Sequence, residues 1–178
     1  SPNYLFIDLL LKKDKPKKFT IKFNKAKKTV LERDYEIFKR QKVDEERETI
    51  NSSDVIYLIT PDRYANGDKN NDEVSYLLEG SDRSNKDGRH GGDIQGIINN
   101  LDYIEDMGFT QIWLNPVLEN NQADYSYHGY STTDYYKIDP RFGSNKLYQD
   151  LSKEGRNRNI GLIKDLVLNH IGSGHWWM

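Results

Sequence analysis

The sequence contains no cysteine, so no disulfide holds the fold and the redox compartment stays undetermined. It also lacks any apolar run of about 18 residues, which is the shortest length expected of a membrane-spanning helix. This absence excludes a membrane span. The opening residues Ser-Pro-Asn-Tyr do not show a basic segment followed by an apolar one, so we expect any export signal of the parent protein to lie outside this chain.

The sequence has no excess of positive charge either, because it contains 26 basic and 28 acidic residues and its formal net charge is -2. The protein has no overall positive field to attract a polyanion, so we expect no nucleic acid among its partners. Lysines are nevertheless concentrated in the first thirty residues, at Lys12, Lys13, Lys15, Lys17, Lys18, Lys22, Lys25, Lys27 and Lys28. Such a run predicts a solvated strand face, or a sheet edge protected by lysine.

The first part of the chain has the pattern of antiparallel β-strands. Segments rich in aromatic and β-branched residues occupy positions 4–10, 19–23 and 30–39. Charged residues alternate there with Phe and Ile, which is typical of half-buried strands in a β-sandwich. The polar segment 41–53 has little to bury and predicts an interdomain linker.

From residue 55 the pattern changes to strands that alternate with helices. Apolar runs at 55–60, 109–114 and 161–168 predict buried strands. Apolar residues at helical spacing predict one helix that begins after Asp93 as its N-cap and stops at Gly108, and a second helix covers 146–156. This order predicts parallel strands joined by right-handed crossovers.

Long loops follow the first two of these strands, whereas the turns from each helix to the next strand are short. A (β/α)8 barrel builds its active site from the loops after its strands, so this asymmetry favours such an enzyme. A doubly wound sheet would share the asymmetry. A complete barrel takes about 250 residues, so we expect this chain to be a piece that is cut at both ends.

The first group of residues that could carry a chemical function is an oxygen-rich loop. It runs from Asp62 to Asp72 and is followed after a gap by Gly91-Gly92-Asp93. Calcium takes such oxygen ligands in sets of six to eight. The loop is not an EF-hand, because a count from Asn66 finds no glycine at the sixth position and Leu77 at the twelfth, where a glutamate is required. On chemistry alone, a loop of this kind is more often a network of Asx turns than a metal site.

Two further constellations follow the second and third strands. Tyr127-His128-Gly129-Tyr130 could offer a sugar a stacking face and hydrogen-bond donors, although a tyrosine-rich loop packed on its own scaffold fits these residues equally. In the second, Asp165-Leu166-Val167-Leu168-Asn169-His170, the carboxylate stands inside an apolar strand. Burying it is costly unless it is paired, so we expect a partner for Asp165, and the sequence offers no obvious one.

Together these motifs resemble the α-amylase superfamily, glycoside hydrolase family thirteen. The resemblance rests on D-x-V-x-N-H after the third strand, on Y-H-G-Y, and on the frames 108–117 and 134–143. The run 89–93 and the N-G-D-x-x-N-D loop narrow it to the neopullulanase and cyclomaltodextrinase branch. It implies a partial (β/α)8 TIM barrel, limited to the first three strands, over residues 49–178. The end of an all-β sandwich domain would precede it over residues 1–48.

The resemblance also implies roles for individual residues. His128 and His170 would hydrogen-bond the glucose at the cleavage subsite, and Tyr130 would stack on its ring. Asp165 and Asn169 would be structural at the active site, with Asp165 paired to the arginine that precedes the nucleophile. The implied ligands of a structural calcium ion are Asn66, Asp68, Asn71, Asp72, Gly91 and Asp93. The catalytic carboxylates of the family lie on later strands, so we expect none in this chain and no activity from it alone.

The implied function of the parent is retaining hydrolysis of α-glucosidic bonds in starch-derived oligosaccharides. An α-glucan oligosaccharide or a cyclodextrin would be the partner, and the branch implies a periplasmic location and a homodimer of the full-length enzyme. A function of another class stays open, namely a non-catalytic carbohydrate-binding or scaffold module derived from an amylase barrel. A downstream reading frame with further strands, a G-x-R-x-D segment and a catalytic glutamate would favour the enzyme.

Overall fold

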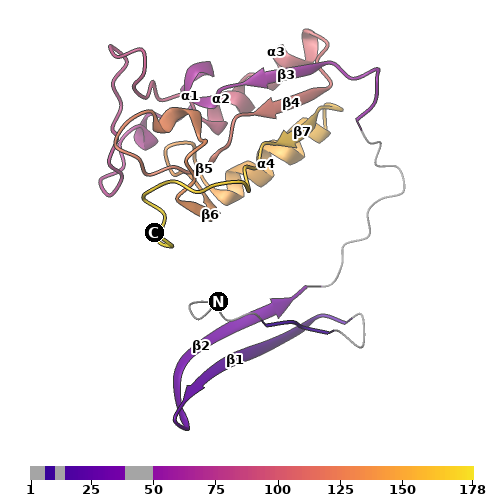
Figure 1. The fold of residues 1–178 in the computed structure, drawn as a ribbon. Coiled ribbons are helices and arrows are strands. Elements are labelled where there is room, and N and C mark those ends of the chain that lie inside the picture. The colour runs from indigo at the N-terminus through magenta and orange to yellow at the C-terminus, as the bar shows by residue number, and fades with distance from the viewer. Residues whose placement is uncertain (1–6, 11–14, 39–49) are drawn as a thin grey trace. The chain divides into compact units, whose positions relative to one another are not determined.

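The computed structural model describes residues 7–10, 15–38 and 50–178, which fall into two compact units divided after residue 49 (Figure 1). Most of the predicted linker, 41–53, lies outside the described residues. So does the start of the first predicted strand, and its remaining part, residues 7–10, forms no strand. No helix in the described part of the chain is long and apolar enough to cross a bilayer.

The first unit contains an antiparallel hairpin of β1 (Lys17–Lys25) and β2 (Lys28–Ile37), which confirms two of the predicted strands. Ala26 and Lys27 join them with φ values of 50° and 64°, as a two-residue turn of the twist-matching kind requires. One face carries the cross-strand ion pairs Lys18–Glu36 and Lys22–Glu32, at 3.0 and 2.9 Å. The lysine-rich strand therefore has a solvated, charge-paired face.

The second unit is built on a parallel sheet of β3 (Ile56–Ile59), β4 (Gln111–Leu114) and β7 (Gly161–Lys164), in the order β3-β4-β7 (Figure 1). The parallel pairing and the places of these strands confirm the sequence prediction. The predicted strand 161–168 is too long, however, because β7 ends with Lys164. Its partner β4 ends opposite, at Leu114, and two residues later Pro116 has no N–H to extend the ladder.

Helices follow the strands, but the predicted helix 94–107 is divided into α2 (Ile94–Asn99) and α3 (Leu101–Asp106). Asn100 interrupts it with φ of -113° and ψ of 14°, and its side-chain amide donates to the Gly96 carbonyl at 2.7 Å. That bond competes with the helical ladder. The predicted ends are confirmed, because Asp93 accepts from the Gly96 N–H at 2.6 Å and Gly108 has φ of 79°. The later helix, α4, spans Asn145–Arg156.

Both long loops contain short regular elements. The loop after β3 holds the short helix α1 (Pro61–Tyr64) and the 3-10 turn η1 (Lys69–Asn71). The loop after β4 holds β5 (Leu118–Glu119) and β6 (Asp134–Ile138), which pair antiparallel, and the 3-10 turn η2 (Ser126–His128) between them. The candidate site residues of these two loops therefore stand on segments that have a defined structure.

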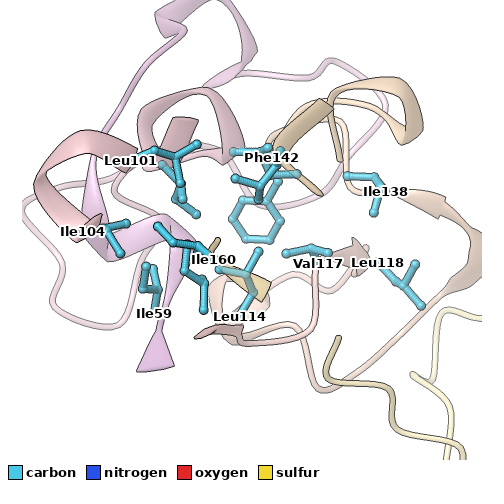
Figure 2. Packing of buried hydrophobic residues seen from close by; sticks show 13 residues of the cluster. Ile59, Leu101, Ile104, Leu114, Val117, Leu118, Ile138, Phe142 and Ile160 are labelled. Carbon is cyan, nitrogen blue, oxygen red and sulfur yellow. The ribbon is translucent and has the colours of Figure 1, made fainter. Parts of the chain in front are cut away.

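The core of this unit lies between one face of the sheet and the helices (Figure 2). Strand residues Ile59 and Leu114 pack there with residues of the helices and loops, and Figure 2 shows the Phe142 ring pointing into the cluster. Burial of apolar area at roughly 25 cal/mol per Å² makes this cluster the main stabilising contribution. The opposite face of the sheet is more open, with Leu58 54% and Trp113 39% exposed.

Candidate functional site

The backbone of Tyr130 is held from both sides by histidines of two different loops. Its N–H donates to Nδ1 of His128 at 2.9 Å, and its carbonyl lies 2.9 Å from Nε2 of His170. The first histidine follows β4 and the second follows β7, which are neighbours in the sheet. Because parallel strands bring their carboxyl ends together, residues far apart in sequence meet here. The structure thus brings His128, Tyr130 and His170 into one cluster.

These contacts assign the protons of both imidazoles. His128 accepts at Nδ1, so its proton is on Nε2, whereas His170 must donate from Nε2 to the carbonyl and leaves Nδ1 as acceptor. Asn169 lies beside that second acceptor, with its amide nitrogen 3.4 Å from Nδ1 of His170. Burial lowers the pKa of His128, while the charge of Glu79 acts in the opposite direction. A lowered pKa keeps His128 neutral at pH 7 and its Nε2–H available as a donor.

Asp165 is paired, as its cost of burial leads one to expect, and both partners lie within this chain, where the sequence offered no obvious one. Its Oδ2 accepts from the Tyr130 hydroxyl at 2.9 Å and from Nε1 of Trp113 at 3.2 Å. Trp113 is reached because it pairs in register with Ile163, and Asp165 stands two residues further along that strand direction. Burial, followed by the bond to Asp165, raises the pKa of Tyr130. The carboxylate therefore fixes the edge of a ring that is 37% exposed.

Tyr135 is a site residue for which the sequence predicts no role of its own. Its hydroxyl lies 2.8 Å from the carbonyls of both Val167 and His170, so it holds the segment after β7 against the β6 strand. The only sequence signal was its place in the motif Asp134-Tyr135-Tyr136.

A buried ion pair lies beneath the loop after β4. Arg141 and Asp139 are 1% and 0% exposed, and Nη2 of the arginine lies 2.7 Å from Oδ2 of the aspartate. Burial acts to raise the pKa of Asp139, but the hydrogen bond and charge of Arg141 and the charge of Arg89 outweigh it and lower the pKa. Arg141 also donates to the carbonyls of Glu79 and Asn120 at 2.7 and 2.9 Å. These bonds join the two long loops.

The oxygen-rich segments converge on the carboxylate of Asp93. Besides capping α2, it accepts from the N–H groups of Gly67 and Asp68 at 3.1 and 2.8 Å, and from the Asn71 amide at 3.2 Å. Asp68 also forms a local Asx turn, since its Oδ1 accepts from the Asn70 N–H at 3.0 Å. The loop therefore contains an Asx turn, and it also brings several of the predicted calcium ligands together around Asp93.

The remaining predicted ligands lie around Asp72. The Asn66 amide donates to both of its oxygens at 2.7 and 2.9 Å, and Gly91 has φ of 83° at a point where a Cβ would come within 2.6 Å of Oδ1 of Asp72. Oδ1 of Asn66 and Oδ1 of Asn71 are buried without a hydrogen-bond partner. Burial raises the pKa of Asp72, and the charge of Asp93 adds to this. Unpartnered oxygens beside carboxylates of like charge fit a hard cation.

No group of three or more His, Cys, Asp or Glu side chains is placed to hold a metal ion in the residues that the structure describes. The three aspartates of the predicted set, Asp68, Asp72 and Asp93, therefore do not form such a group. Bound calcium therefore stays a prediction.

The model of the alpha amylase catalytic domain matches residues 58–178, which is more than half of the chain. The chain belongs to the α-amylase family. A second model, for the N-terminal domain of cyclomaltodextrinase, matches residues 1–41. The two matches lie on either side of the boundary between the two compact units.

Curated members of the α-amylase family resemble this chain over about two thirds of its length. The cyclomaltodextrinase of Thermoanaerobacter pseudethanolicus is 40% identical over 118 residues, 66% of this chain and 20% of the relative. Neopullulanase 2 of Thermoactinomyces vulgaris is 40% identical over 119 residues, again 66% and 20%. The beta/alpha-amylase of Paenibacillus polymyxa is 45% identical over 123 residues, 68% and 10%. The chain thus spans a fifth or less of these relatives.

Solved structures of α-amylase family enzymes share the fold. An Anoxybacillus alpha-amylase superposes with a TM-score of 0.62 and 43% identity, over 70% of this chain and 26% of that one. The cyclic alpha-maltosyl-(1-->6)-maltose hydrolase of Arthrobacter globiformis gives a TM-score of 0.59 and 36% identity, over 69% and 27%. The second unit therefore has part of the α-amylase catalytic-domain fold.

Proposed function

We propose that this chain is part of a retaining α-glucan hydrolase of the neopullulanase and cyclomaltodextrinase type, which cleaves α-glucosidic bonds in starch-derived oligosaccharides. The observation that carries the proposal is the cluster in which His128 and His170 hold the backbone of Tyr130 from two neighbouring loops. The names of the relatives, which include a cyclomaltodextrinase and a neopullulanase, support a cyclodextrin or an α-glucan oligosaccharide as the substrate.

Each residue of the cluster offers a sugar one kind of contact. The partly exposed ring of Tyr130 provides a flat apolar face for stacking, and its hydroxyl is fixed by Asp165. Neutral His128 provides the donor Nε2–H, since its Nδ1 is already occupied. His170 is anchored through Nε2, so it contributes its exposed ring edge and Nδ1 as acceptor. These contacts bind and orient a glucose unit but break no bond.

Retaining hydrolysis requires two carboxylates about 5 to 5.5 Å apart, one to attack the anomeric carbon and one to protonate the leaving oxygen. We assign neither role to a residue of this chain, because Asp165 is engaged by Tyr130 and Trp113. The catalytic pair would come from the remainder of the parent barrel. The chain alone is therefore expected to bind sugar weakly and to hydrolyse nothing.

The finer fold assignment follows from the same proposal. β3, β4 and β7 would be the first three strands of a (β/α)8 barrel over residues 49–178, and the β1–β2 hairpin would be the remnant of the β-sandwich domain over residues 1–48. The match of residues 1–41 to the cyclomaltodextrinase N-terminal model supports the second part. Parallel order and long loops after the strands support the first. Dimerisation of the full-length enzyme and a periplasmic location remain proposals that rest on the branch.

A calcium ion would be held by Asn66, Asp68, Asn71, Asp72, Asp93 and the carbonyl of Gly91, and its role would be structural. It would supply positive charge where the buried carboxylate of Asp93 and the half-buried carboxylates of Asp68 and Asp72 accompany two buried, unpartnered amide oxygens. These residues join the loop after β3 to the start of α2 through the bonds that Asp93 makes. The ion would strengthen that connection and would not contact the sugar.

The test compares the purified chain with the full-length enzyme in a reducing-sugar assay with β-cyclodextrin and pullulan. The enzyme should release sugar, and His128→Ala and His170→Ala should each lower kcat/KM, with kcat affected more than KM if the bond strengthens as charge develops on the sugar. The chain alone should release none. Release by the chain that disappears in the double variant His128→Ala, His170→Ala would show that the catalytic residues are wrongly assigned.

A further inference from the structure

Ser126 is the anchor of the turn that carries His128, and it is fully buried. All three of its polar groups are bound by residues from other parts of the two loops. Its N–H donates to Oε2 of Glu79 at 2.6 Å, its Oγ accepts from Nη1 of Arg89 at 3.2 Å, and its carbonyl accepts from the Asn120 amide at 3.1 Å. Ser126 therefore has no freedom to move without breaking a buried hydrogen bond.

The two partners from the loop after β3 are themselves fixed. Arg89 is 1% exposed, its guanidinium lies over the Phe142 ring at 4.6 Å, and its Nε is 3.8 Å from Oδ1 of Asp62. The carbonyl of Glu79 accepts from the buried Arg141 at 2.7 Å. The anchor is thus connected to the hydrophobic core and to the buried ion pair.

The turn needs such an anchor because the residue before it has an unfavourable backbone conformation. Tyr125 has φ of 59°, in the left-handed region that bulky residues rarely adopt, and such conformations persist where the surroundings hold them. The next residue but one, Tyr127, is covered by the guanidinium of Arg63 at 4.0 Å, and Arg63 also belongs to the loop after β3. That loop therefore holds the turn at two successive points.

We propose that Glu79 and Arg89 are positioning residues for His128, which act through Ser126 and never touch the sugar. Ser126 and His128 are the two ends of the same 3-10 turn, whose Gly129 N–H returns to the Ser126 carbonyl at 3.3 Å. A shift of Ser126 would rotate the turn and move the Nε2–H of His128 away from its ligand. The inference rests on the proposed role of His128 in the sugar subsite.

The experiment measures kcat/KM for β-cyclodextrin with the full-length enzyme. Glu79→Ala removes an acceptor that is a charged group and should lower kcat/KM about tenfold, whereas Glu79→Gln keeps an acceptor oxygen and should stay within about twofold of the wild type. The matched control is Glu73→Ala. Glu73 belongs to the same loop and also accepts from a backbone N–H, that of Ser81 at 2.8 Å, but it does not reach the turn. This control should leave kcat/KM unchanged.

A double-mutant cycle with His128→Ala then separates positioning from general loss of structure. If Glu79 acts through His128, Glu79→Ala should have no further effect on kcat/KM once His128 is alanine. Effects that multiply would overturn the inference, and so would a normal kcat/KM in Glu79→Ala while His128→Ala is impaired. An unchanged kcat/KM in His128→Ala would overturn the sugar subsite itself, and the positioning role with it.

Glu79→Ala is useful only if the enzyme still folds, so Ser126→Ala serves as the second variant. It keeps the backbone bonds to Glu79 and Asn120 and removes only the acceptor of Arg89. It should lower kcat/KM in the same direction by a smaller factor and should show the same loss of effect in the His128→Ala background. A wild-type kcat/KM in Ser126→Ala would show that Arg89 has no positioning role.

Discussion

The hydroxyl of Tyr130 donates to Asp165 across 2.9 Å, and this bond is one of several that join the loop after β4 to the segment after β7. It also separates two contributions of one side chain, because the hydroxyl binds protein while the ring face stays available to a ligand. The two contributions can be removed one at a time.

Tyr130→Phe should therefore keep the stacking face and lose only the bond to Asp165, which costs about 1 kcal/mol of protein stability. Tyr130→Ala should lose the ring as well as the hydroxyl. Its binding free energy for maltotriose, measured with the full-length enzyme, should be weaker than that of Tyr130→Phe by about 1 kcal/mol, or about fivefold in Kd. Urea unfolding measures the first effect and isothermal titration calorimetry the second. Equal Kd values for the alanine and phenylalanine variants would argue against stacking.

The stability of the protein should depend on pH through His128. Its pKa in the folded state is lowered by burial, so the unfolded chain binds the proton more tightly. The stabilisation is complete above the unfolded pKa of about 6.5 and is lost as the pH falls through and below that value. Protonation of Nδ1 would also remove the acceptor of the Tyr130 N–H. The free energy of unfolding of the wild type should thus fall more steeply between about pH 7.5 and 5 than that of His128→Gln. Parallel curves for the two proteins would contradict this assignment.

Calcium should raise the melting temperature, and Asn71→Ala should remove the increase. At a free concentration of 100 Kd, a ligand of the folded state adds about 2.7 kcal/mol of stability. Scanning fluorimetry in millimolar CaCl2 and in EDTA measures the difference. The control is Asn85→Ala, since Asn85 lies in the same long loop and its side-chain oxygen accepts from the nearby Asp87 N–H in a local turn. A wild-type melting temperature that is the same in CaCl2 and EDTA would leave the loop as a network of Asx turns.

Arg141→Met should be strongly destabilising. It leaves Asp139 charged and buried without its partner, a change that costs about 3 to 5 kcal/mol in proteins. The matched control is Arg158→Met, because Arg158 pairs with Asp102 at 2.8 Å while Asp102 is largely exposed. Urea denaturation should show a much smaller loss for the control. Equal losses for the two variants would mean that the buried pair has no special role.

The ends of elements could be predicted where one residue decides them. Asp93 and Gly108 are local signals, a side-chain acceptor and a left-handed backbone, and the structure confirms both. The break at Asn100 was missed because asparagine inside a helical pattern is usually tolerated, and only the bond to the Gly96 carbonyl reveals it.

The partners of Asp165 could not be predicted, because they depend on the register of two strands. Trp113 donates to it from the neighbouring strand and Tyr130 from the loop that follows. An alternating pattern shows which face a residue occupies, but the position along the next strand is fixed only by pairing. The anchoring residues Glu79 and Arg89 were missed for a related reason, since the loop around them has no periodic pattern.

The open face of the sheet has a practical consequence for handling the protein. Leu58 and Trp113 leave that face apolar, and within the described residues the outer strands β3 and β7 each pair on one side only. Unpaired strand edges next to exposed apolar side chains are templates for association between chains. Produced by itself, the chain should thus be kept dilute, because this surface favours loss of monomer at high concentration.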